Sequence, residues 1–255
     1  MNKQTTLRDL YLEHKKGKVS SKWESYFTIY ERHLKELRLK RLDMVEIGVQ
    51  NGGSLDLWSQ YFPFAQICGI DVDHRVSKLV YETNRISVLV GAASSKEVIS
   101  KVQAKFPKGL DLVIDDGSHR SKDTVYNFVN YFHLLKPGGL FIVEDMHAGY
   151  WHEFGGGINE PLSCIGFFKN LIDLINIEHS RDTFNLDDLF GKYFPQGVKP
   201  VCLKTQSIAA ITAYNSVFII EKASDWLEPK LGSVVIVGSE AIVNDKVSQG
   251  FGGTS

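Results

Sequence analysis

Residues 44–54 read Met44-Val45-Glu46-Ile47-Gly48-Val49-Gln50-Asn51-Gly52-Gly53-Ser54. A short, mostly apolar run is followed by a glycine-rich turn and then by the amphipathic run Leu55–Trp58. This order predicts a strand, a tight turn and a helix that Ser54 caps. Such a turn lets a ligand lie against bare backbone. The stretch therefore predicts the first strand–helix unit of an α/β fold.

The same alternation continues along the next hundred residues. Short apolar runs separated by amphipathic stretches predict five strands, at 44–47, 66–70, 86–90, 110–114 and 140–143. Strands that alternate with helices indicate parallel crossovers and a doubly wound sheet. Residues 207–214 and 216–221 predict two more strands that complete it with an antiparallel C-terminal edge. The predicted fold class is α/β.

The length and composition are enough for one core. A chain of 255 residues that is 43% hydrophobic can bury most of its apolar surface in a single domain. We expect this domain to cover residues 1–247, with an N-terminal helical cap at 1–41 and a loop-rich, substrate-side insertion at 146–200. Residues 248–255 are rich in Gly and Ser, and we expect them to be disordered.

Charge and cysteine content limit the classes of partner. Lys and Arg number 29 against 30 Asp and Glu, so a net charge of −1 gives no support for binding nucleic acid or an anionic membrane. Cys68, Cys164 and Cys202 are scattered, which predicts reduced core residues. No run approaches the ~20 apolar residues of a membrane span. We expect a soluble cytoplasmic protein with a small-molecule or glycan acceptor; the oligomeric state, a homo-oligomer included, stays open.

Two acidic clusters directly follow predicted strands. Asp115-Asp116-Gly117-Ser118-His119 follows one strand, and Glu144-Asp145 follows the next. If these strands are parallel neighbours, the carboxylates and the imidazole meet at the carboxyl edge, where open α/β sheets bind ligands. The pattern predicts a metal site with a base beside it. The alternative is that the acids only cap a helix near Lys122 or end a strand in solvent.

A further acid ends the second predicted strand. Asp71 lies 23 residues after Gly48, where a carboxylate can accept hydrogen bonds from both ribose hydroxyls of an adenosine-containing cofactor. Gln50 replaces the second glycine of G-x-G-x-x-G, which a pyrophosphate needs for close approach. S-adenosylmethionine therefore fits better than NAD. A plain turn with Asp71 as a solvated cap is the alternative.

Four motifs stand in the order of the class I S-adenosylmethionine-dependent methyltransferases: Glu46–Ser54, Gly69–Asp73, Val113–His119 and Glu144–Trp151. The acidic motifs resemble those of the bacterial subgroup of macrolide-sugar O-methyltransferases and cephalosporin-hydroxylase-like proteins. The resemblance extends to Lys22–Tyr26 and Lys169–Asp173 and covers most of residues 10–222. It implies a Rossmann-like methyltransferase domain that methylates a sugar hydroxyl of a glycan or glycosylated natural product.

The resemblance also implies roles for single residues. Metal ligands for Mg2+ or another hard divalent cation would be Asp116, Glu144 and Asp145, with His119 as the general base. A cation acidifies a coordinated hydroxyl, and an imidazole with an ordinary pKa of about 6.5 can take the proton. The cofactor site would comprise Glu46, Gly48, Asn51, Gly52, Ser54, Asp71 and Tyr26, with Lys22 and Tyr26 at the methionine end.

The adenine and acceptor ends are less clearly marked. Ala92 stands where relatives usually carry an acid for the adenine amino group, which leaves backbone or Ser94 to recognise it. His147, Tyr150 and Trp151 are candidate substrate residues. The rings of Tyr150 and Trp151 can stack on a sugar face, with ordinary loop packing as the alternative, and His147 is either a second base or a hydrogen-bonded loop residue. Two other classes remain: a nicotinamide-dependent oxidoreductase and a non-catalytic cofactor-binding subunit.

Overall fold

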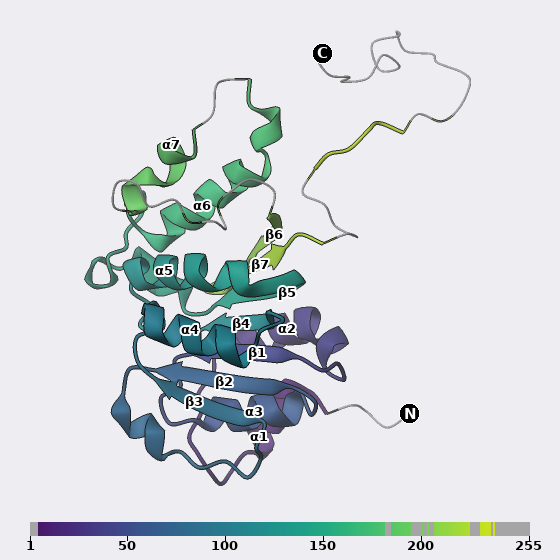
Figure 1. Ribbon diagram of the computed structural model, residues 1–255, viewed down its shortest axis with the longest axis vertical. Coiled ribbons are helices and arrows are strands. Elements are labelled where there is room, and N and C mark those ends of the chain that lie inside the picture. The colour runs from purple at the N-terminus through teal and green to yellow at the C-terminus, as the bar shows by residue number, and fades with distance from the viewer. Residues whose placement is uncertain are drawn as a thin grey trace.

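The protein is described by a computed structural model, which places residues 5–181, 185–194, 200, 203, 207–224, 230–235 and 237. A seven-stranded sheet runs through these residues in the order β3-β2-β1-β4-β5-β7-β6 (Figure 1). Its strands are β1 (Asp43–Ile47), β2 (Gln66–Asp71), β3 (Ile86–Val90), β4 (Leu110–Asp115), β5 (Leu135–Val143), β6 (Ile208–Ala213) and β7 (Phe218–Lys222). Strands β1 to β5 pair in parallel, whereas β7 is antiparallel to both β5 and β6. The predicted mostly parallel sheet with an antiparallel edge is confirmed.

Helices cover both faces of the sheet. They are α1 (Leu7–Glu13), α2 (Glu24–Leu34), α3 (Gly53–Tyr61), α4 (Lys96–Lys105), α5 (Ser121–Tyr131), α6 (Cys164–Ile175) and α7 (Leu186–Phe190). Figure 1 shows α6 and α7 next to α5, at the end of the sheet away from β3. Since side chains alternate between the faces of a strand, each central strand contributes to two cores.

One core lies between the sheet and α4, α5 and α6, and contains Val45, Val113 and Phe128. The other lies between the sheet and α1, α2 and α3, and contains Met44 and Leu112 from the same two strands. Continuous apolar runs are required where both faces of a strand are buried, which explains the runs that the sequence shows.

Two predicted boundaries were wrong. Residues 136–139, which precede the predicted fifth strand at 140–143 and whose Pro137 and two glycines indicate a turn, lie within β5. Leu110 pairs with Leu135 and Leu112 with Leu140, so the extra residues of β5 form an irregularity between two paired ends. At the other boundary, Gly52 rather than Ser54 occupies the cap position of α3, because the turn needs its left-handed backbone with φ 82°.

The remaining structural predictions concern the cysteines, the C-terminal tail, membrane-spanning helices and the domain boundaries. Cys68 and Cys164 are buried and free, as expected. Cys202 and the tail 248–255 lie outside the described residues. In the part of the chain that the structure describes, no helix is long and apolar enough to span a bilayer. The domain boundaries stay a prediction.

Candidate active site

The two acidic clusters meet at the carboxyl edge of the sheet. Strand β4 lies between β1 and β5, and Asp115 pairs with both Ile47 and Val143. The backbone N–H of Asp116 donates to Ile47 O at 2.9 Å, and that of Glu144 donates to Asp115 O at 2.9 Å. Helix α5 begins at Ser121 with Arg120 in the cap position, so neither aspartate caps it. The sheet register brings the clusters together.

A cavity of about 760 Å³ opens at this edge. Its wall combines the glycine turn, the ends of β2 and β3, both acidic clusters and the segment Val19–Trp23 that precedes α2. This volume is in the range of small-molecule and cofactor sites. Of the predicted cofactor residues, Gly48, Ser54 and Asp71 line the cavity.

Asp71 holds the glycine turn in shape. One oxygen, Oδ2, accepts from the backbone N–H groups of Val49 and Gln50, both at 2.8 Å. Gly48 has φ 92°, and a Cβ there would lie 2.0 Å from the carbonyl oxygen of Asp116. The glycine is therefore required by the neighbouring acidic loop as well as by the turn. Asp71 both lines the cavity and orders its floor.

Glu46 supports the turn from below. It is fully buried and accepts from Ser54 Oγ at 2.7 Å and from Trp58 Nε1 at 3.0 Å. Burial raises the pKa of Glu46 to about 7, against the opposing effects of Lys22 and these hydrogen bonds. Three other predicted cofactor residues, Asn51, Gly52 and Tyr26, lie like Glu46 outside the residues that form the cavity wall.

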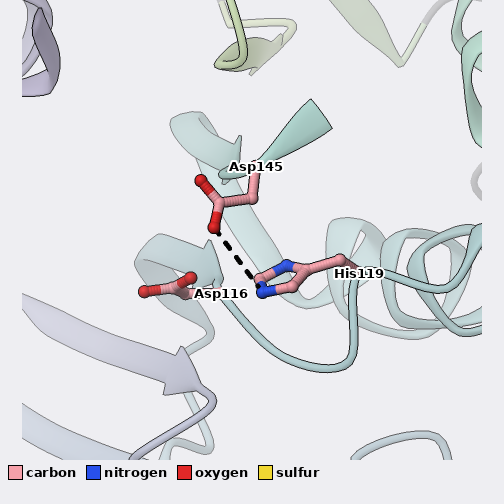
Figure 2. A group of neighbouring side chains, drawn as sticks. All are labelled: Asp116, His119 and Asp145. Carbon is pink, nitrogen blue, oxygen red and sulfur yellow. Dashed lines mark ion pairs between the residues drawn. The ribbon is translucent and has the colours of Figure 1, made fainter. Parts of the chain in front are cut away.

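An imidazole and two carboxylates converge on one point of the cavity. Ligand atoms of Asp116, His119 and Asp145 all lie within 4.8 Å of one another (Figure 2). His119 Nε2 is 3.7 Å from Asp145 Oδ2. Two groups bind the other oxygen of Asp145, Oδ1: Tyr26 Oη donates to Oδ1 at 2.6 Å, and Trp23 Nε1 donates to Oδ1 at 3.0 Å. Oδ2 is thus left for the cluster.

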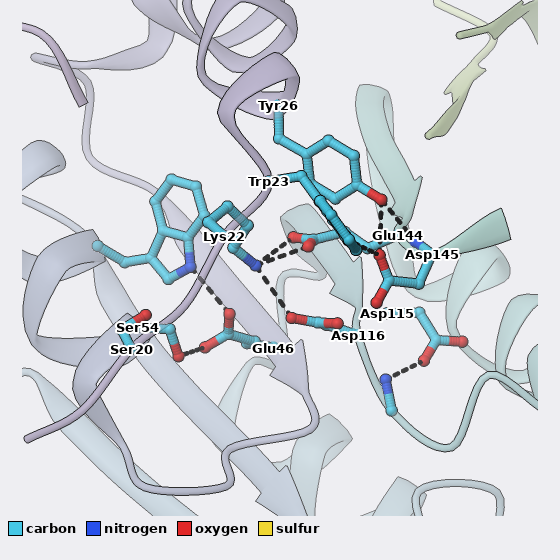
Figure 3. A network of polar contacts seen from close by, with 12 residues as sticks. Ser20, Lys22, Trp23, Tyr26, Glu46, Ser54, Asp115, Asp116, Glu144 and Asp145 are labelled. Carbon is cyan, nitrogen blue, oxygen red and sulfur yellow. Dashed lines mark hydrogen bonds and ion pairs between the residues drawn. The ribbon is translucent and has the colours of Figure 1, made fainter. Parts of the chain in front are cut away.

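Glu144 takes a different position, deeper in the protein. Lys22 Nζ donates to both Glu144 oxygens, at 2.6 and 2.7 Å, and to Asp116 Oδ2 at 2.9 Å (Figure 3). Tyr30 Oη also donates to Glu144. Burial alone would lower the pKa of Lys22, but the charges of Glu144 and Asp116 hold it well above its usual value. Burial raises the pKa of Glu144, and the Lys22 ammonium opposes this.

Asp115, which had no predicted role, anchors the acidic loop. It is buried, and it accepts from Asn127 Nδ2 at 3.1 Å and from the backbone N–H of Gly117 at 3.3 Å. Burial raises the pKa of Asp115 to about 7, although both hydrogen bonds lower it. The side chain faces α5 rather than the other carboxylates, which explains why the two adjacent aspartates differ.

The comparisons with known proteins agree with this architecture. The mycinamicin VI 2''-O-methyltransferase of Micromonospora griseorubida is 34% identical over 57% of this chain and 38% of its own length. The demethylmacrocin O-methyltransferase of Streptomyces fradiae is 33% identical over 64% of this chain and 43% of its own. Among solved structures, the MycE methyltransferase of the mycinamycin biosynthetic pathway, in complex with Mg and SAH, matches with a TM-score of 0.71 and 26% identity, over 90% of this chain and 56% of that one.

The chain is a homologue of the macrolide-sugar O-methyltransferases. The resemblance seen in the sequence, and the methyltransferase fold it implied, are confirmed. This O-methyltransferase homologue spans less than half the length of the curated relatives quoted. No protein-family profile matches it.

A row of aromatic rings lies beside Asp145. The ring centroid of His147 lies 4.9 Å from that of Trp151 and 6.0 Å from that of Trp23, edge to face in both cases. Tyr150, Trp151 and Trp23 are exposed. Trp23 was not among the predicted site residues; its only sequence signal was its place in the Lys22–Tyr26 motif.

Proposed function

We propose that the chain is an S-adenosylmethionine-dependent, divalent-metal-assisted O-methyltransferase that acts on a sugar hydroxyl of a glycan or glycosylated natural product. The observation that carries this proposal is the shared cavity, which the glycine turn and the Asp116, His119 and Asp145 cluster both line. Relatives named as sugar O-methyltransferases, and a structural neighbour in complex with Mg and SAH, support it.

The cofactor would bind along the glycine turn. Gly48 and the turn held by Asp71 offer backbone at close approach, and Asp71, which lines the cavity, would accept further hydrogen bonds from ribose hydroxyls. Ala92 and Ser94 line the cavity at the end of β3, so the adenine amino group would meet the backbone or the Ser94 hydroxyl there. Gln50 has φ 51°, with a side chain where a dinucleotide site needs a bare glycine, which disfavours a nicotinamide-dependent oxidoreductase.

The acidic residues fit a hard divalent cation. Asp116 and Glu144 converge closely enough to share one positive group, and Asp116, Glu144 and Asp145 all line the cavity. These three residues would hold Mg2+, which when bound supplies the positive charge that makes a sugar hydroxyl more acidic. A purely cofactor-binding subunit would not need this acidic set.

His119 would accept the hydroxyl proton at Nε2. Asp145 Oδ2, 3.7 Å away, stabilises the imidazolium that results. Loss of the proton would make the oxygen nucleophilic enough to take the methyl group, with the C–S bond of the sulfonium breaking and S-adenosylhomocysteine leaving; the acidic loop and the cofactor turn would fix the approach. The reaction needs the cofactor and the acidic residues in one cavity. This agrees with the position of the cavity at the ends of β1, β4 and β5, where the glycine turn and the two acidic loops meet.

The acceptor would enter over the aromatic rings. His147 and Trp151, joined by Trp23, present apolar faces with polar edges, and Trp23 donates to Asp145, as sugar recognition requires. Tyr150 is exposed next to Trp151 in the chain. We propose a small-molecule glycoside or glycan as the acceptor, and a cytoplasmic location in keeping with biosynthetic relatives. A homo-oligomer stays a prediction that light scattering on the purified chain tests.

Calorimetry with S-adenosylhomocysteine tests the cofactor assignment. We expect S-adenosylhomocysteine to bind the wild-type chain saturably, with or without Mg2+, and we expect NADH not to bind it. Incubation with S-adenosylmethionine and a panel of rhamnosides and macrolide glycosides should then give a product heavier by one methylene, in a reaction that EDTA stops and Mg2+ restores. Failure to bind S-adenosylhomocysteine would contradict the proposal, and preferential binding of NADH would favour the oxidoreductase.

A further inference from the structure

A lysine from the N-terminal segment lies inside the acidic site. Lys22 Nζ is the cation that Asp116 and Glu144 share, and only 2% of its side chain is exposed. Glu144 directs both of its oxygens to this ammonium. Two of the three carboxylates that would hold Mg2+ are therefore already paired with a cation of the chain itself.

The backbone that carries Lys22 is fixed to the cofactor side of the cavity. Val19 O accepts from the backbone N–H of Gly53 at 3.2 Å, and Lys18 Nζ pairs with Asp56 at 2.9 Å. A Cβ on Gly53 would lie 2.3 Å from Lys18 O, so the segment packs against α3 at a distance that only glycine permits. The ammonium is delivered from an anchored segment, and its flexible stem can still move.

The same carboxylate oxygens cannot bind an ammonium and a divalent ion together as tightly as they bind either one alone. A divalent ion placed on Asp116 and Glu144 would lie a few ångströms from the ammonium and would be repelled by it in this poorly solvated site. It would also need lone pairs that now accept from Lys22. Binding of the ion must therefore weaken or break the Lys22 contacts.

We propose that Lys22 is a tethered cation that competes with the divalent metal for Asp116 and Glu144, and so sets the metal affinity of the site. The ammonium holds the two carboxylates close together before the metal arrives, and it leaves Glu144 when the metal binds. This inference rests on the metal site of the proposed function. It makes Lys22 a positioning residue that acts through the ligands.

Metal binding to Lys22→Met tests the competition. Met keeps much of the apolar stem and removes the charge. We expect Mn2+, titrated without cofactor and followed by electron paramagnetic resonance, to bind the variant roughly tenfold more tightly than the wild-type chain. The matched control is Lys136→Met: Lys136 also bridges two carboxylates, Asp43 at 2.9 Å and Asp111 at 2.7 Å, but at the opposite end of the sheet. Its Mn2+ affinity should equal that of the wild type.

A second measurement needs no variant. Acylation of lysines in the wild-type chain, mapped by mass spectrometry with and without Mg2+, should show Lys22 becoming more reactive when the metal is present. Lys18, anchored on α3, should not change and serves as the internal control. This labelling experiment tests the competition between Lys22 and the metal even if Lys22→Met fails to fold.

The outcomes separate the two proposals. Equal or weaker Mn2+ binding to Lys22→Met, or Lys22 labelling that ignores Mg2+, would overturn the competition and leave the metal site intact. Absence of Mn2+ binding to the wild type and both variants would overturn the metal site itself and the competition with it.

Discussion

His119 and Asp145 lie side by side in the cavity wall, on two loops that share an unusual backbone conformation. Nε2 of His119 lies 3.7 Å from Oδ2 of Asp145, and the two residues have φ values of 56° and 52°. Left-handed backbone is uncommon outside glycine, and it concentrates where a site fixes its side chains. The first loop follows β4 and the second follows β5, so each turns sharply as its strand ends (Figure 2).

Replacement of the imidazole should separate chemistry from binding. We expect His119→Asn to lower kcat by roughly 10²–10⁴-fold, because the base is lost, while S-adenosylhomocysteine affinity stays within about twofold of wild type. Asn tolerates left-handed backbone better than Ala, so the loop is preserved. His179→Asn, at an exposed position, is the control. Turnover that survives in His119→Asn would remove His119 from the mechanism.

Removal of one carboxylate charge should weaken metal binding. We expect Asp116→Asn to lower Mg2+ affinity, measured by calorimetry, by roughly 10-fold or more, because a ligand charge is lost with little change in shape. Asp43→Asn is the matched control, since Asp43 also pairs with a lysine at 2.9 Å but lies at the amino end of β1. Equal affinities in the two variants would exclude Asp116 as a ligand.

A methyl group on Gly48 should lower the stability of the fold and prevent cofactor binding. Gly48→Ala places a Cβ 2.0 Å from Asp116 O at a φ of 92°, so we expect a loss of about 2 kcal/mol or more in unfolding free energy. S-adenosylhomocysteine binding should also fail. Gly191→Ala meets only an ordinary contact at 3.4 Å and should leave both properties near wild type. Chemical denaturation and calorimetry check these outcomes; a stable, binding-competent Gly48→Ala would contradict the described turn.

Glu46 should make stability depend on pH. Its pKa rises from 4.5 to about 7 on folding, so between these values the folded chain holds more protons than the unfolded chain. The unfolding free energy therefore falls as pH rises through this window, by about 3 kcal/mol from this group. Glu46→Gln keeps an acceptor for Trp58 and should remove that part of the fall.

Urea denaturation at pH 5 and pH 7.5 measures the difference, with Glu36→Gln as an exposed control. The unfolding free energy of Glu46→Gln should fall less between the two pH values than that of the wild type, whereas that of Glu36→Gln should fall as much as that of the wild type. Parallel behaviour of all three chains would show that Glu46 titrates normally in the fold.

Local pattern was sufficient for the strands but not for their exact ends. The apolar runs at β1 and β4 are visible because a strand buried on both faces must be continuously hydrophobic. The start of β5 was missed because Pro137 and two glycines signal a turn, and only pairing with β4 shows that the chain stays in the sheet there. Ser54 was misassigned as a cap because Glu46, eight residues earlier, takes its hydroxyl.

The sequence by itself determined that this chain alternates strands with helices and carries a glycine turn and two acidic loops directly after strands, because apolar burial shows in short-range patterns. The order of the strands, which brings these loops together at one edge of the sheet, is set by long-range pairing. Tertiary structure alone decided how the charges in that edge are shared. Lys22 and Glu144 are 122 positions apart, yet they meet as a buried pair, whereas the adjacent Asp115 and Asp116 face different partners. Electrostatic interactions depend on distance and solvation, and both are set only when the helices and loops have packed around the sheet.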